Sequence, residues 1–197
     1  TGAVRKDSFL YHERMHAFLQ RTYSPEAFIN QDDVFQEAIS DFAFASFTKN
    51  PRFDDGVDLL RDISKLQNGR KIIDNLTQLS DDTYERSILI SNFLWNLNSE
   101  IGLEKGWSFT KNFIDDLNRY YKSFHDWQKI NLGKVSSLQQ YLYNLEYMLA
   151  VVSKTNNPII GKQVSLFVKK WVLSRTRIDV LKNFLSADSR SFDHVPQ

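Results

Sequence analysis

Apolar residues recur three and four positions apart along most of the chain, which is the spacing of one face of an α-helix. No alternating apolar and polar run of useful length accompanies them, so strands are expected to contribute little. The pattern therefore predicts an all-α protein. Short connections between successive helices favour an antiparallel helical bundle or an irregular helical solenoid, formed by one domain over residues 1–197.

The first quarter of the chain, over residues 7–48, predicts two main helices joined by a loop. The first should begin at a cap formed by Asp7 or Ser8, and the second at Asp32 or Asp33. Between them Ser24-Pro25-Glu26 predicts a short helical turn with proline first, and Asn50-Pro51 should end the second helix. The apolar positions of these helices are Phe9, Leu10, Met15, Phe18 and Leu19 in the first and, turned inward, Val34, Phe35, Ala38, Ile39, Phe42 and Phe47 in the second.

Helices are expected to continue over residues 52–186, followed by a frayed tail at 187–197. Asp54-Asp55-Gly56 should open a helix that Asn68-Gly69 stops, and Ser80-Asp81-Asp82 should cap a later one. The remaining predictions are a helix through 72–79, chain breaks at Gly102 and Gly106, a long helix from Ser108 to Gly133, and two final helices through 138–149 and 158–181.

The strongest chemical signal is the H-E-x-x-H pattern of His12, Glu13 and His16. Residues four apart lie on one face of a helix, so both imidazoles can reach a single ion. Catalytic zinc takes three protein ligands and leaves a fourth position for water, and two histidines with one glutamate are a common set. Glu37, on the second predicted helix, would supply the third ligand.

Two further carboxylates have roles that follow from this arrangement. Glu13 would project beside the ion, where it can accept a proton from zinc-activated water as that water attacks a carbonyl. A ligating histidine usually donates its other ring N–H to a carboxylate, and Asp41, one turn after Glu37, is the candidate acceptor. The set predicts hydrolysis with Zn²⁺ as the cofactor.

These residues resemble the zinc signature of the thermolysin-like metallopeptidases and, more broadly, the gluzincins. Five of the six residues in the family's Asn-Glu-Ala-Ile-Ser-Asp segment stand here at positions 36–41, and the resemblance covers roughly residues 8–47. It implies His12, His16 and Glu37 as ligands, Glu13 as general base, and a peptide or protein as substrate. Secretion is favoured by the resemblance alone.

The resemblance also raises two expectations beyond the ligand set. In the family a β-rich lobe precedes the zinc helix and pairs with the substrate backbone, whereas only eleven residues precede His12 here. Either the chain is a piece of a longer protein or has a separate N-terminal lobe or chain as a partner, or substrate is held in another way, or the site is no longer catalytic. The family uses a further histidine at the oxyanion, for which His125 is the candidate, with Tyr120 or Tyr121 as alternatives.

Composition narrows the remaining choices. The chain contains no cysteine, which excludes disulfides and thiolate metal sites and leaves histidine and carboxylates as the strong ligands. No run of eighteen apolar residues occurs, so no membrane span is expected. Fifteen Phe, eight Tyr and four Trp predict a folded protein with a substantial aromatic core.

Charge supports an alternative function. Residues 26–62 carry nine acidic and three basic side chains, whereas residues 154–182 carry seven basic and one acidic. The acidic stretch suits a cation site, and the basic stretch is most simply a solvated helix face, so nucleic acid is not expected as a partner. The alternative hypothesis is a catalytically inactive interaction scaffold that binds a partner through the basic 162–182 face.

Overall fold

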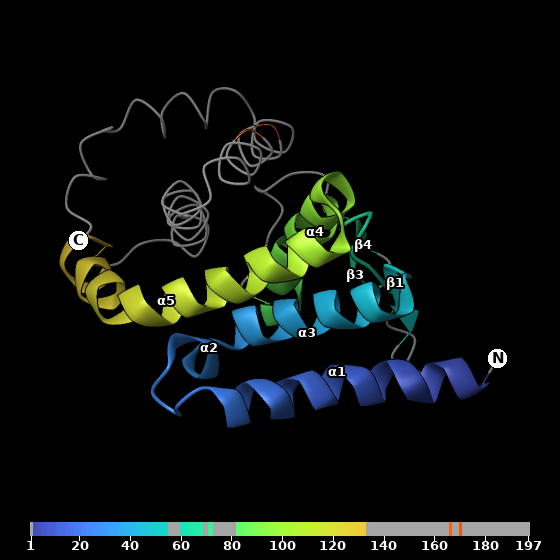
Figure 1. Cartoon of the computed structure of the whole chain (residues 1–197), viewed down its shortest axis with the longest axis horizontal. Coiled ribbons are helices and arrows are strands. Elements are labelled where there is room, and N and C mark those ends of the chain that lie inside the picture. Colours follow the sequence, from blue (N-terminus) through green and yellow to red (C-terminus); the bar gives the residue numbers. More distant parts are fainter. Residues whose placement is uncertain are drawn as a thin grey trace.

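The computed structural model describes residues 2–54, 60–68, 71–72, 82–132, 166 and 170, and it is mostly helical over these ranges, which confirms the all-α prediction. Within them, side chains are described over 10–52, 61–67 and 82–119 and at 166 and 170. The helices are α1 (Gly2–Thr22), α2 (Phe28–Gln31), α3 (Asp33–Thr48), α4 (Thr83–Ile101) and α5 (Leu103–Leu132). Figure 1 shows α1 and α3 side by side in opposite directions, with α5 beyond α3.

The helix boundaries near the N-terminus agree only in part with the sequence pattern. Helix α1 starts at Gly2, so the prediction of a cap at Asp7 or Ser8 is wrong. Helix α2 starts at Phe28, three residues after Pro25, because residues 25–26 form a turn instead. Asp32 does cap α3, since its side chain accepts a hydrogen bond from the Phe35 N–H at 3.1 Å.

The helix predicted from Asp54 to Leu66 is also wrong. The described part of this segment forms short antiparallel strands, β1 (Arg52–Asp54), β2 (Leu60–Asp62), β3 (Gln67–Asn68) and β4 (Lys71–Ile72), which neighbour one another in chain order. Asn92 of α4 donates its side-chain N–H to the Ile63 carbonyl, and the Ile63 N–H donates to the Pro51 carbonyl at 3.0 Å. These long-range partners override the helical spacing of Leu60, Ile63 and Leu66, since strand formation depends on tertiary context.

Helices α4 and α5 meet at a close turn. Asp82 caps α4 by accepting from the Glu85 N–H at 2.9 Å, as predicted, and Gly102 ends α4 with a φ of 89°. Helix α5 then begins at Leu103, five residues before the predicted start at Ser108. Gly106 therefore lies inside a helix and does not break it; a Cβ there would meet the Asn98 side chain, so glycine permits the close approach of the two helices.

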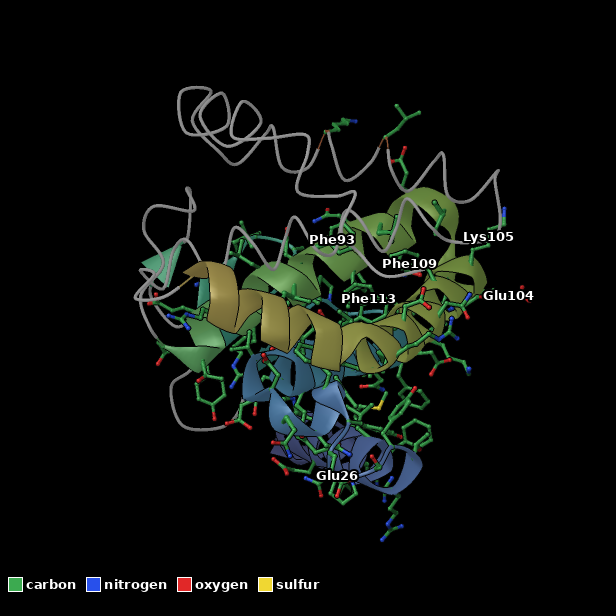
Figure 2. All side chains as sticks on the ribbon, turned by 90° about the vertical axis from the view of Figure 1, so that its left-hand side faces the viewer. Glu26, Phe93, Glu104, Lys105, Phe109 and Phe113 are labelled. Carbon is green, nitrogen blue, oxygen red and sulfur yellow. The ribbon has the colours of Figure 1, made fainter. Side chains whose placement is uncertain are left out.

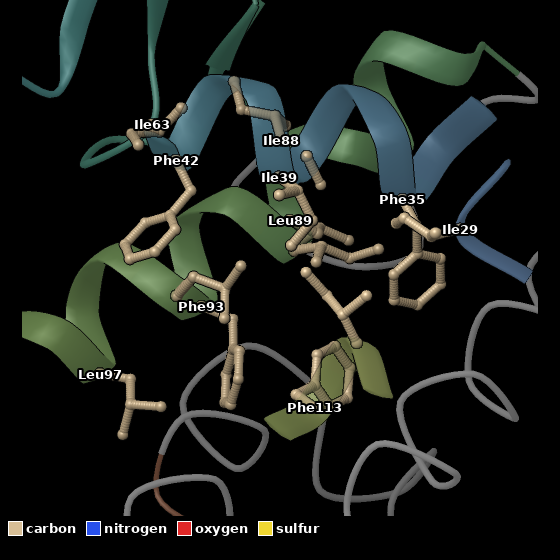
Figure 3. Close-up of a cluster of buried hydrophobic side chains, with 14 of the residues drawn as sticks. Ile29, Phe35, Ile39, Phe42, Ile63, Ile88, Leu89, Phe93, Leu97 and Phe113 are labelled. Carbon is tan, nitrogen blue, oxygen red and sulfur yellow. The ribbon is translucent and has the colours of Figure 1, made fainter. Parts of the chain in front are cut away.

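The core lies where α3, α4 and α5 face one another (Figure 3). Phe42 of α3 and Phe93 of α4 are fully buried, and Phe93, Phe109 and Phe113 point into the space between α4 and α5 (Figure 2). Phe47 was predicted to face inward, but it is exposed. It lies in the last turn of α3 with its ring 4.5 Å from the ring of Tyr11, on the side where the described residues leave a groove.

The loop between α1 and α3 is fastened to α5. The Tyr23 hydroxyl donates to Asp115 at 2.9 Å, and the Ile29 N–H donates to the Asn118 side chain at 3.0 Å. Burial and the hydrogen bond to Asp115 raise the pKa of Tyr23 to about 12, so the hydroxyl remains a donor at neutral pH. The spacing of α1 from α3 therefore depends on α5 as well as on their direct contact.

Several predictions fall on residues that the structure does not describe. They are the rest of the helix through 72–79, the helix through 138–149, the tail at 187–197 and the helix through 158–181 apart from 166 and 170, which are helical. Among the described helices, none is both long and apolar enough to cross a membrane.

Substitution Gly106→Ala tests the close approach of α4 and α5. In an ordinary helix interior this change is stabilising by roughly 1 kcal/mol, but here the new Cβ would clash with the Asn98 side chain. We expect a net destabilisation of about 1–2 kcal/mol in chemical denaturation. Adding Asn98→Ala should recover most of the loss, whereas a stabilising Gly106→Ala would show that the helices are not in contact there.

Candidate functional site

Helix α1 places the two histidines of the H-E-x-x-H pattern on one face. The rings of His12 and His16 lie edge to face with centroids 4.7 Å apart, and their Nε2 atoms are 3.0 Å apart. Both side chains are mostly buried against α3. The four-residue spacing thus brings the two nitrogens to a common point, as the sequence predicts.

Helix α3 brings the predicted third ligand to the same point. Glu37 Oε2 lies 3.1 Å from His12 Nε2, and Glu37 Oε1 lies 3.4 Å from His16 Nε2. Among the described residues, His12, His16 and Glu37 are the group of histidine and carboxylate side chains close enough together to hold a metal ion.

The outer nitrogens of the two rings fix the tautomers. His12 Nδ1 lies 3.0 Å from Asp41 Oδ1, and His16 Nδ1 lies 3.1 Å from Gln36 Oε1. A carboxylate oxygen and an amide oxygen only accept hydrogen bonds, so each Nδ1 carries a proton. In the neutral rings both Nε2 lone pairs therefore point at each other and at a carboxylate, and this arrangement requires a cation between them.

The spacing of the three groups fits a tetrahedral metal. Bonds of 2.0–2.1 Å at tetrahedral angles separate neighbouring ligand atoms by about 3.3–3.4 Å. His12 Nε2 lies 3.0 Å from His16 Nε2 and 3.1 Å from Glu37 Oε2, a few tenths of an ångström short of this spacing, whereas the 3.4 Å contact of His16 Nε2 is with the other carboxylate oxygen, Glu37 Oε1. Two imidazoles and one carboxylate form a donor set suited to zinc and to other divalent transition metals.

Arg61 is a further part of the site that the sequence analysis missed. Its Nη1 lies 3.0 and 3.1 Å from the two oxygens of the fully buried Asp41 and 3.8 Å from Glu37 Oε2. The guanidinium also stacks on the Tyr84 ring, with Cζ 4.4 Å from the centroid. Strand β2 carries Arg61, and the helix predicted for this segment gave no reason to place it beside α3; the uncommon buried Asp41, which needs a positive partner, was the available signal.

The carboxylates of the site raise the pKa values of both histidines. Burial by itself lowers the pKa of His12, but hydrogen bonds with Asp41 and Glu37 outweigh it and raise the pKa to about 9. The pKa of His16 is also raised, because its hydrogen bond with Glu37 outweighs burial. Burial would raise the pKa of Glu37, yet the hydrogen bonds from both histidines hold it well below its usual value.

A small cavity borders these residues. It has a volume of about 230 Å³ and is lined by His16, Asp33, Gln36 and Glu37 from the metal side and by Thr83 and Tyr84 at the start of α4. Two of the three predicted ligands therefore form its wall. The cavity gives a small molecule or a side chain access to the edge of the site.

The other predicted catalytic residues are not brought into the cluster. Glu13 is exposed on the turn of α1 between the histidines, and it pairs with no described residue. His125 lies within α5, but its side chain is outside the described residues, as are those of Tyr120 and Tyr121. Their catalytic roles remain predictions.

Comparisons with known proteins find no matching family model, no similar curated protein and no similar solved structure. The resemblance to gluzincins therefore rests only on the short residue motifs described above. The basic 162–182 face of the alternative hypothesis lies outside the described residues apart from 166 and 170.

Protonation of His12 should be visible in the stability of the metal-free protein. Its pKa is 6.5 when unperturbed and about 9 in the folded state, so the folded protein binds this proton more tightly. The resulting stabilisation is complete below pH 6.5 and is lost as the pH rises to 9, by about 3 kcal/mol in all. Chemical denaturation across this interval, with a chelator present, measures the loss.

The control for this titration is His12→Gln, which removes the group and should reduce the dependence between pH 6.5 and 9 to the part contributed by His16, whose pKa is also raised. An unfolding free energy that rises over the interval in the unmodified chain would contradict the assigned proton.

Proposed function

We propose that the chain is a zinc-dependent metallopeptidase-like domain of gluzincin type, which hydrolyses peptide bonds. The observation that carries this proposal is the convergence of His12 Nε2, His16 Nε2 and the Glu37 carboxylate within 3.0–3.4 Å of one another. Asp41 and Gln36 support it, because they hold both rings in the tautomer that a metal requires. Zinc bound there would supply a Lewis acid that makes a water molecule nucleophilic near neutral pH.

The protein's own groups would handle the protons of the reaction. Glu13 is exposed beside His12, where its carboxylate can accept a proton from water as the water oxygen bonds to the substrate carbonyl carbon. The same proton then passes to the leaving nitrogen as the C–N bond breaks. The products are a carboxylic acid and an amine, and Glu13 returns to its carboxylate form.

Arg61 would offset part of the negative charge of the site. With neutral histidines, Glu37 and Asp41 contribute two negative charges and Arg61 one positive charge. A buried pair of carboxylates without a cation would be strongly destabilising, and Arg61 supplies that cation to Asp41 through two hydrogen bonds. The same Asp41 side chain contacts His12 Nδ1 at 3.0 Å.

Metal binding is the first test. We expect about one zinc ion per chain by elemental analysis after dialysis, and Glu37→Gln or His12→Ala should weaken zinc binding at least about 100-fold, because each removes one of three ligands. Glu13→Gln is the matched control on the same helix and should keep the ion. Equal zinc content in all four proteins would place the metal elsewhere.

Hydrolysis is the second test, and Glu13→Gln is the informative variant. With zinc bound, cleavage of a quenched fluorescent peptide mixture should fall by about 10²–10⁴-fold, since general-base catalysis accounts for a factor of this size. Zinc content and the circular dichroism spectrum should stay unchanged. Hydrolysis at the original rate would remove Glu13 from the mechanism, and an unmodified chain that binds zinc without cleaving any peptide would leave only the metal site.

A further inference from the structure

A large apolar groove lies on the side of α1 away from the metal ligands. Its volume is about 860 Å³, and none of His12, His16 and Glu37 lines it. The walls come from α1, the second half of α3 and the first turns of α5. The main apolar side chains on the walls are Tyr11, Met15, Phe18, Phe44, Phe47 and Trp107.

Large apolar side chains on this groove are exposed to solvent to an unusual degree. Phe47 is 66% exposed, Phe18 is 55% exposed, and Leu103 at the start of α5 is 41% exposed. Single exposed apolar residues are common, but several that line one concavity mark an interaction site. The described part of the chain contains no side chain that covers them.

The charged residues that line the groove within the described part of the chain all have one sign. They are Arg14, Lys49 and Lys111, and none of the described lining residues is acidic. Lys111 is paired with Asp115 at 2.7 Å, whereas no described carboxylate pairs with Arg14 or Lys49. Arg14 lies over the Tyr11 ring, with Cζ 5.7 Å from the centroid, so its charge is held at the apolar wall.

We propose that this groove docks an amphipathic helix of a partner protein, with apolar residues along one side and acidic residues at their flanks. The α1 wall runs from Tyr11 to Thr22, about 16 Å, which is the length of three helical turns. Grooves of this kind bind helices through apolar anchors about one turn apart. Arg14 and Lys49, which pair with no carboxylate in the described part of the chain, select for acidic flanks.

Charge also argues against the nearest alternatives. A second copy of the chain docked groove to groove would bring the same basic rim against itself, and the chain's own basic 162–182 segment would be repelled in the same way. A membrane surface carries the right charge but is flat, whereas the apolar residues here line a concavity.

The test uses two synthetic helical peptides of about fourteen residues, four turns. Both carry Leu at the positions of one face, with Glu at every flanking position in the first and Lys in the second. Fluorescence anisotropy should show binding of the Glu peptide to the full chain, about tenfold tighter than binding of the Lys peptide. The double variant R14E/K49E should reverse this preference, because both positions are exposed and the apolar wall is kept.

Two controls separate docking from other causes. Phe18→Ser with Phe47→Ser should weaken both peptides about equally while the circular dichroism spectrum stays unchanged. Because the chain has no cysteine, Phe47→Cys gives a single thiol, which should react rapidly in the free chain and slowly with the Glu peptide bound.

Three results would overturn the proposal. Equal binding of the Glu and Lys peptides would show that Arg14 and Lys49 do not select for acidic flanks. A Phe47→Cys thiol that is unreactive in the free chain would show that another part of the chain covers the groove. Binding of vesicles containing one quarter anionic lipid, with no binding of either peptide, would make the face a membrane surface instead.

Discussion

The site depends on one constraint, which is that two imidazole lone pairs and a carboxylate face one another across about 3 Å. Asp41 and Gln36 prevent relief by a change of tautomer, because both accept hydrogen bonds from the outer ring nitrogens. The helices prevent relief by separation, because α1 and α3 are packed together. A positive charge at the centre is then the remaining solution, and a proton on His12 provides it in the metal-free protein.

Helix α3 connects the site to the hydrophobic core. Its outer face presents Glu37 and Asp41 to α1, and its inner face buries Phe35, Ile39 and Phe42 in the core. Ligand positions on such a buried helix are more exact than positions on a loop. The rigidity of the site therefore depends on the core beneath it. Core substitutions are expected to change the positions of the metal ligands.

The sequence was most informative where the interactions are local. The spacing of His12 and His16, the caps at Asp32 and Asp82, and the break at Gly102 depend on neighbours within a few residues, and the structure has all of them. Arg61 and the strands around it depend on partners twenty or more residues away, Asp41 and Asn92, and the contact of Gly106 with Asn98 joins two different helices. A helical spacing of apolar residues could not reveal these partners. It also could not reveal that Phe47 is exposed at the end of α3.

The hydrogen bonds of Tyr23 and Ile29 to α5 mean that α5 helps to position the metal ligands, although none of its described side chains is a ligand. Undocking of α5 would release the loop between α1 and α3 and let the ligands drift apart. By linkage, an ion that binds only the assembled ligands must favour the docked helix by the same free energy. Amide exchange in α5 would then slow on metal loading, at positions remote from the ion itself.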